Sequence, residues 1–99
     1  MVQGTRDLAN DWIVGRYGRG DKARMYQRGV VTIYFSYDTP VGYNVPEEGT
    51  VARVNSWGPT TGGHLNQFSD PQNRISGAEF EQRYRAMLKR NGIDAYDLR

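Results

Sequence analysis

The chain has 99 residues, of which 13 are basic and 11 acidic, with one histidine and no cysteine. This length allows a single domain with a small core, and the absence of cysteine excludes disulfides, thiolate nucleophiles and zinc sites built on sulfur. Because one histidine is the only nitrogen ligand left, we expect no metal site and no cofactor. The formal net charge of +2 is lower than the dense positive charge typical of nucleic-acid-binding proteins.

The charges are unevenly distributed along the chain. Residues 1–35 carry six basic and three acidic side chains, residues 36–73 carry one and four, and residues 74–99 carry six and four. The middle is therefore acidic and both ends are basic. No apolar run is long enough to span a membrane, and no basic and then hydrophobic signal segment follows the first residue, so we expect a cytoplasmic protein.

The first part of the chain, residues 1–21, is expected to combine a helix with a flexible loop. The helix is predicted from Arg6 to Val14, where Thr5 can cap the first turn and apolar residues recur at helical spacing. The loop is predicted next, because three glycines fall within residues 15–20 and alternate with arginines.

The sheet is predicted within residues 22–68. Strand-forming residues and a period of two predict four strands, at about residues 24–27, 30–35, 41–45 and 50–55. Glycines and prolines mark the turns between them. The short connections favour an antiparallel meander, since parallel strands would need long crossovers.

The clearest helix is predicted over residues 76–92. Ser76 and Glu79 form a capping box at its start, and apolar residues then recur on one face at helical spacing. The stripe consists of Phe80, Tyr84, Met87 and Leu88. We therefore predict one domain over residues 1–99 of the α+β class: a small antiparallel sheet of about four strands, packed with an N-terminal and a C-terminal helix.

Two linked segments, residues 36–42 and 56–68, gather chemically active side chains in turns and a glycine-rich stretch. We interpret them as a fold-defining or recognition motif made of Tyr37, Thr39, Pro40, Trp57, Thr60, Thr61, His64 and Asn66. In the structural interpretation, Thr60 or Thr61 caps a short helix and His64 bonds to backbone or to Tyr37.

A catalytic interpretation of the same motif ranks below the structural one and below ligand or partner contact. It would make His64 a base towards Ser or Thr, with Asp38 orienting the imidazole. The sequence offers no nucleophile elbow, so we expect no enzyme. A buried His64 bonded to backbone in a closed motif would count further against catalysis.

A basic segment near the N-terminus suits single-stranded nucleic acid or an acidic partner, because it combines cations with a stacking ring. Its candidate contact residues are Arg16, Tyr17, Arg19, Lys22, Arg24 and Arg28. Basic positions of the last helix could extend this surface: Arg83, Arg85, Lys89 and Arg90. A solvated loop without a partner is the competing interpretation.

The two motif segments lie within a region, about residues 28–68, that resembles a known family. They resemble a family of small domains of unknown function, frequent in bacteriophages, with the pattern Ser-Tyr-x-Thr-Pro-[Ile/Val]-[Ala/Gly], a strand, then Ser-x-Thr-Thr-x-x-His-x-Asn. The matching residues are Ser36, Tyr37, Thr39, Pro40, Val41, Gly42, Thr60, Thr61, His64 and Asn66. The resemblance implies phage origin more strongly than an activity, because the family has no established reaction.

The expected function follows from this resemblance and from the surplus of Tyr, Trp and Arg. We expect a small non-structural phage protein that binds a host or phage protein in the host bacterial cytoplasm, without catalysis. The alternative is a nucleic-acid-binding accessory protein. A homodimer through an unpaired strand edge is also open.

Overall fold

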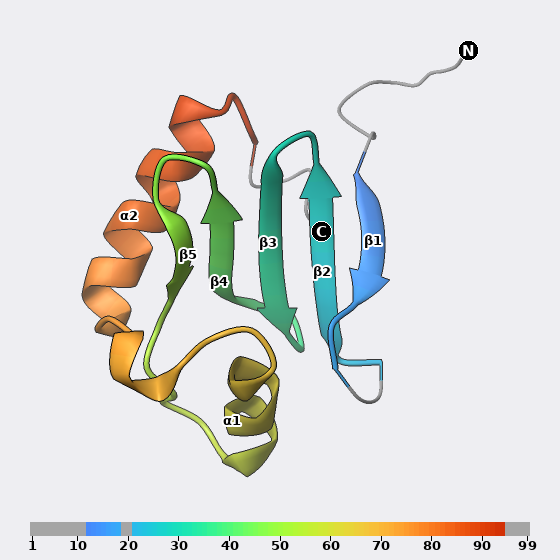
Figure 1. The fold of residues 1–99 in the computed structure, drawn as a ribbon, viewed down its shortest axis with the longest axis vertical. Coiled ribbons are helices and arrows are strands. Elements are labelled where there is room, and N and C mark those ends of the chain that lie inside the picture. Colours follow the sequence, from blue (N-terminus) through green and yellow to red (C-terminus); the bar gives the residue numbers. More distant parts are fainter. Residues whose placement is uncertain (1–11, 19–20, 95–99) are drawn as a thin grey trace.

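The computed structural model describes residues 12–18 and 21–94, which form one antiparallel sheet and two α-helices (Figure 1). In chain order the elements are β1 (Ile13–Arg16), β2 (Ala23–Arg28), β3 (Val31–Ser36), β4 (Thr39–Val45), β5 (Gly49–Ala52), α1 (Pro59–Asn66), a short 3₁₀ helix (Pro71–Asn73) and α2 (Gly77–Arg90). The predicted α+β class is confirmed.

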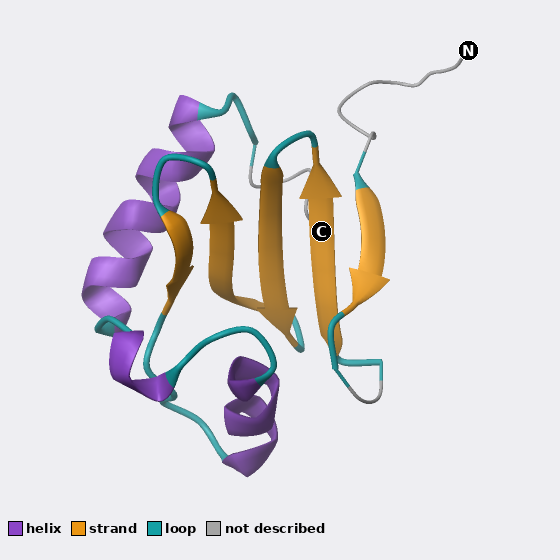
Figure 2. Cartoon of the chain, viewed as in Figure 1, coloured by secondary structure: helices purple, strands orange, loops and turns teal. Residues whose placement is uncertain are grey.

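The five strands follow one another in space in the order in which they occur along the chain, as Figure 2 shows in orange. Each strand pairs antiparallel with the next, which is the arrangement that short turns produce. Gly29 and Gly49 turn the chain with φ of 60° and 71°, in the left-handed region that glycine adopts most readily. The predicted meander is confirmed, with five strands in place of about four.

The additional strand is β1, and it replaces the end of the predicted N-terminal helix. Ile13 and Val14 are β-branched, and Val14 lies opposite Tyr26 in β2. Pairing with a neighbouring strand therefore overrides the helical spacing of the apolar residues. The prediction of a helix reaching Val14 is wrong, and its earlier part lies outside the described residues.

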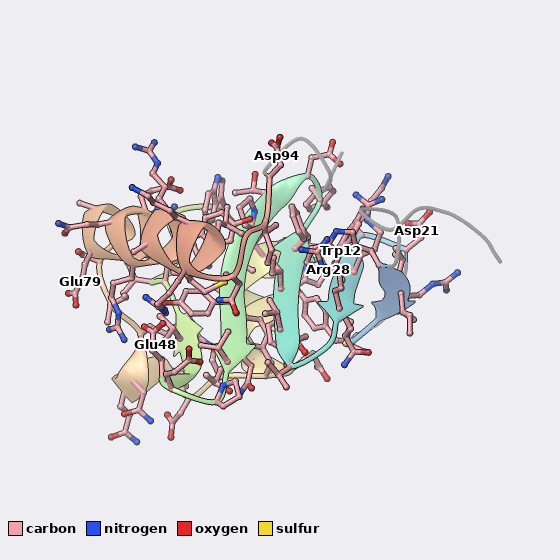
Figure 3. All side chains as sticks on the ribbon, turned by 90° about the horizontal axis from the view of Figure 1, so that it is seen from above. Trp12, Asp21, Arg28, Glu48, Glu79 and Asp94 are labelled. Carbon is pink, nitrogen blue, oxygen red and sulfur yellow. The ribbon has the colours of Figure 1, made fainter. Side chains whose placement is uncertain are left out.

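Helix α2 packs across one face of the sheet, where it can be seen above the strands in Figure 3. Ser76 caps the helix as predicted, because its hydroxyl accepts a hydrogen bond of 3.1 Å from the backbone N–H of Glu79. The predicted apolar stripe is buried. The main core of the described residues comprises Val31, Ile33, Phe35, Tyr43, Val45, Val51, Phe80, Tyr84, Met87, Leu88 and Ile93.

Glu48, in the turn between β4 and β5, anchors that turn to α2. Its carboxylate accepts hydrogen bonds from the Tyr43 hydroxyl at 2.8 Å and from guanidinium groups of Arg83 at 2.9 Å and Arg90 at 2.7 Å. Burial opposes ionisation of Glu48, but these donors outweigh it and lower its pKa below the ordinary value. The turn is thereby joined to β4 through Tyr43 and to α2 through the two arginines.

Helix α1 lies against the opposite face of the sheet. Alternate residues of β3 point to opposite sides, so Ile33 and Phe35 face the main core whereas Tyr34 packs against the cluster that contains Leu65 of α1. Phe68, just after α1, stacks on Tyr34 of β3 with ring centroids 4.1 Å apart. Gly42 makes this approach feasible, since a Cβ there would overlap the Phe68 ring. A second, smaller core forms from Val41, Ala52 and Leu65.

Neither helix of the described part of the chain combines the length and the apolar character needed to cross a membrane.

Candidate functional site

The two predicted motif segments meet at the end of the sheet where β3 turns into β4, and a pocket of about 190 Å³ lies between them. Its walls come from the β3–β4 hairpin, from the loop before α1 and from α1 itself. The lining residues are Ser36, Tyr37, Thr39, Val41, Trp57 and Thr61. Four of these six were predicted as motif residues, and all six side chains are uncharged.

The floor of the pocket contains a buried chain of hydrogen bonds. The Ser36 hydroxyl lies 3.0 Å from the Thr61 hydroxyl and 2.7 Å from Nδ1 of His64. The same three side chains are the buried polar groups among the described residues. The two hydroxyls and Nδ1 of His64 therefore each find a partner away from water, which the burial of polar groups requires.

This arrangement corrects the predicted partner of His64. Its Nδ1 meets the side chain of Ser36, where backbone or Tyr37 was predicted. The orienting role that the catalytic interpretation would give Asp38 is not found, because that carboxylate is 98% exposed and pairs with Arg24 at 2.9 Å. The helix cap was also predicted wrongly: Gly58 caps α1 without a side-chain hydrogen bond, and Thr61 reaches Ser36 instead.

Tyr37 forms one rim of the pocket in a strained backbone conformation. Its φ of 58° makes it the single described non-glycine residue with a positive φ, in a two-residue turn between Ser36 and Thr39. Arg24 holds the turn through a hydrogen bond of 3.2 Å to the Tyr37 carbonyl. Strain of this kind persists where surrounding contacts enforce it, and it concentrates at functional sites.

Trp57 forms the other rim. Asn55 fixes the loop, because its side chain accepts from the Trp57 N–H at 2.9 Å and donates to the Gly58 carbonyl at 3.1 Å. The Arg53 guanidinium lies 4.7 Å from the centre of the Trp57 ring, a cation–π contact. Trp57 nevertheless stays 46% exposed, as does Tyr37.

The remaining predicted motif residues lie outside this pocket. Thr60 lines a separate hollow of about 250 Å³, which His64 also lines. Asn66 accepts a hydrogen bond of 2.8 Å from Arg74. Pro40 lies in β4 opposite Phe35. These three residues shape the fold around the pocket, and they do not contribute to its walls.

The predicted stacking ring of the basic segment is engaged inside the protein. The Tyr17 hydroxyl donates a hydrogen bond of 2.8 Å to the Phe35 carbonyl, and its ring packs edge-on against Tyr34, Phe68 and His64. Burial, with a smaller contribution from Tyr34, raises the pKa of Tyr17 well above its ordinary range. This ring is not available to stack on a base.

Two of the four described cations of the predicted basic surface also have partners. Arg24 holds the strained turn, and Arg28 lies over the Trp12 ring at 4.8 Å, where Figure 3 labels the pair. Arg16 and Lys22 are exposed beside an open groove that Asp21 also lines. Arg19 lies outside the described residues.

Three of the four basic positions named in α2 form ion pairs with carboxylates. Arg83 and Arg90 bind Glu48, and Arg85 lies 3.8 Å from the carboxylate of Glu81 one turn away. Lys89 is exposed on the helix. The helix therefore presents a mixed surface, without the uniform positive charge that a phosphate backbone attracts.

Ser36 and Val41 were named as residues that match the family pattern but not as candidate site residues, although Ser36 is central to the hydrogen-bonded floor. One signal could have indicated it: alternation along β3 places Ser36 on the same face as Tyr34, opposite the apolar residues of the main core. In the described part of the chain, no three His, Asp or Glu side chains are grouped so as to hold a metal ion.

The fold and the pocket define a small α+β domain that carries a neutral, aromatic-rimmed recess. The comparisons with known proteins place the chain in a family: residues 10–82 match a family of unknown function (DUF8033), and the chain belongs to it. No curated protein and no solved structure matches the chain.

Proposed function

We propose that this chain is a small non-structural bacteriophage protein that binds a host or phage protein in the host bacterial cytoplasm, and that it acts without catalysis. The observation that carries the binding function is the pair of half-exposed rings, Tyr37 and Trp57, at the rim of a single pocket. Phage origin and cellular setting rest on the sequence resemblance given above.

The physical case for protein recognition starts from the residue types. Tyr, Trp and Arg dominate the binding energy of protein interfaces, and the Arg53 guanidinium lies over the ring of Trp57. The rim is also held in place before binding, by Asn55 in the loop and Arg24 at the turn. A pre-organised surface loses less conformational entropy when a partner docks.

Catalysis has weaker support, although a serine hydroxyl and an imidazole lie in contact. Ser36 is only 3% exposed, and the nearest predicted carboxylate, Asp38, is turned to Arg24. The contact of Ser36 with His64 and Thr61 satisfies three buried polar groups, which a structural role explains without any reaction.

Affinity capture from lysate of the phage's bacterial host tests the proposal. The wild-type chain should retain a specific protein that Trp57→Ala loses. Val30→Ala is the matched control, because Val30 is an exposed apolar residue in the β2–β3 turn, at the other end of the sheet (Figure 1). Capture that is equal in all three chains, or no specific capture, would reject binding through this rim.

Nucleic-acid binding remains the weaker proposal, supported by the exposed cations Arg16 and Lys22 beside an open groove. Affinity for single-stranded DNA or RNA should then fall steeply as salt rises, and an Arg16→Gln, Lys22→Gln double variant should reduce that salt dependence. Undetectable binding at low salt would remove this alternative.

A further inference from the structure

The pocket described above has a size that selects among side chains. Its volume of about 190 Å³ exceeds the roughly 150 Å³ of an engineered apolar cavity that accommodates benzene. One six-membered aromatic ring therefore fits, with room for a small substituent. Tyr37 and Trp57 supply aromatic faces and edges at the rim, against which such a ring packs favourably.

The lining also selects on charge. All six residues that form it are uncharged, so a carboxylate, phosphate or ammonium group entering the pocket would lose its hydration without gaining an opposite charge. The occupant is consequently a neutral group. Val41 provides an apolar wall, whereas Ser36 and Thr61 provide hydroxyls, so an apolar body with a polar tip suits the pocket.

The buried hydrogen-bond chain determines what that tip is. When Nδ1 of His64 accepts from Ser36, Ser36 accepts from Thr61, and Thr61 offers lone pairs to the pocket. When Nδ1 carries the proton, the chain reverses, and Thr61 is free to donate its own. A hydroxyl group suits both states, because it donates and accepts at one atom.

We propose that the pocket binds a tyrosine side chain of the partner protein, with its ring against Tyr37 and Trp57 and its hydroxyl on Thr61 and Ser36. This inference rests on the proposed protein-binding function and names the group that the pocket recognises. Thr61 is then a specificity residue: it distinguishes tyrosine from phenylalanine, and the aromatic rim distinguishes both from leucine.

The test uses small probes with the full chain. N-acetyl-tyrosinamide is titrated while the Trp57 indole N–H is followed by NMR, with Trp12→Phe assigning that signal, since the chain has two tryptophans. N-acetyl-phenylalaninamide should bind about fivefold more weakly, the effect of one hydrogen bond. N-acetyl-leucinamide and O-phosphotyrosinamide should shift the signal least.

Two variants isolate the hydroxyl. Thr61→Val keeps the branched shape and should remove the preference for tyrosinamide over phenylalaninamide, whereas Thr61→Ser should keep it. The amide spectrum of each variant shows whether the fold is intact. If a variant unfolds, the affinities of the wild-type chain for tyrosinamide and phenylalaninamide are sufficient to decide whether the pocket selects for the hydroxyl.

The proposal is overturned if phenylalaninamide or leucinamide binds as tightly as tyrosinamide, if no probe shifts Trp57, or if uridine binds more tightly, which would indicate a nucleobase site. These outcomes differ from failure of the proposed function. A partner captured through Trp57 without selection for tyrosine leaves protein binding in place and removes only this inference.

Discussion

The Ser36 hydroxyl and Nδ1 of His64 lie 2.7 Å apart, although 28 positions separate them in the sequence. Ser36 ends strand β3, and His64 lies in helix α1. Their contact joins α1 to the sheet, and the Thr61 hydroxyl extends it by a second bond of 3.0 Å. The first role of His64 is therefore structural: it connects α1 to β3.

Replacement of His64 by Ala should destabilise the protein by roughly 2–4 kcal/mol, because a buried ring is lost and Ser36 loses one partner. His64→Asn should cost less, since its amide can still reach the hydroxyl. Urea denaturation measures both. Equal stability of wild type and His64→Ala, together with loss of partner binding, would instead mark His64 as a recognition residue.

Gly42→Ala should destabilise by about 1–3 kcal/mol, because the new Cβ would overlap the Phe68 ring and force a rearrangement. Gly63→Ala is the control: it lies in α1, and nothing lies within 4 Å of an added Cβ. That change should stabilise by about 0.5–1 kcal/mol through helix propensity. Thermal melts of the two variants should therefore shift in opposite directions, and a shift in the same direction contradicts the packing described.

Tyr37→Asn should raise stability while it weakens partner binding. Asparagine tolerates the left-handed conformation better than tyrosine, which relieves up to about 1 kcal/mol of strain. The half-exposed ring contributes little to the core, but it forms the pocket rim. Parallel chemical denaturation and capture experiments measure the trade-off. A less stable variant with intact binding would show that the ring is structural.

Acid should weaken the protein through Glu48. Its pKa is lower in the folded state than the ordinary 4.5, so its contribution is complete above that value and is lost as pH falls through the folded pKa. Glu48→Gln should lower stability at pH 7 by roughly 1–3 kcal/mol and flatten the dependence below pH 4.5. Denaturation series at several pH values test this. If the stability of Glu48→Gln falls with decreasing pH as steeply as that of the wild type, other carboxylates cause the acid dependence.

Alkali should weaken the protein through its buried and half-buried tyrosines. Burial and a hydrogen bond to Glu48 raise the pKa of Tyr43 to about 12. Burial raises the pKa of Tyr17, Tyr34 and Tyr84 as well. Their contribution is complete below the ordinary value of 10.0 and is lost as pH rises through the folded pKa values. Absorbance at the phenolate band should show these rings titrating together with unfolding, and Tyr43→Phe should reduce the effect.

Local sequence signals predicted much of the fold. The alternation within Val31–Ser36 and Thr39–Val45 identified the central strands, and the capping box with its stripe identified Gly77–Arg90. These features depend on near neighbours. The assignment of Ile13 to a helix failed because β1 is an edge strand that forms by pairing with β2. The local sequence around Ile13 does not indicate that pairing.

The sequence was sufficient to predict several residues of the candidate site, but not which of them contact one another. Trp57 and Thr61 stood out as motif residues, and both line the pocket. The partner of His64 was missed, because contact with Ser36 depends on how α1 docks. Tyr17 was misjudged as exposed for the same reason, since its aromatic neighbours come from distant parts of the chain.

Helix α1 is attached far more lightly than α2. Three buried apolar side chains form the cluster between α1 and the sheet, against eleven in the main core of the described residues. Elements with few buried contacts open locally, at a free energy below that of global unfolding. Because Thr61 forms part of the pocket, undocking of α1 dismantles the pocket while the strands stay paired. Hydrogen exchange in Pro59–Asn66 should consequently be faster than in β3, and an occupant that bridges Tyr37 and Thr61 would slow it by keeping the helix in place.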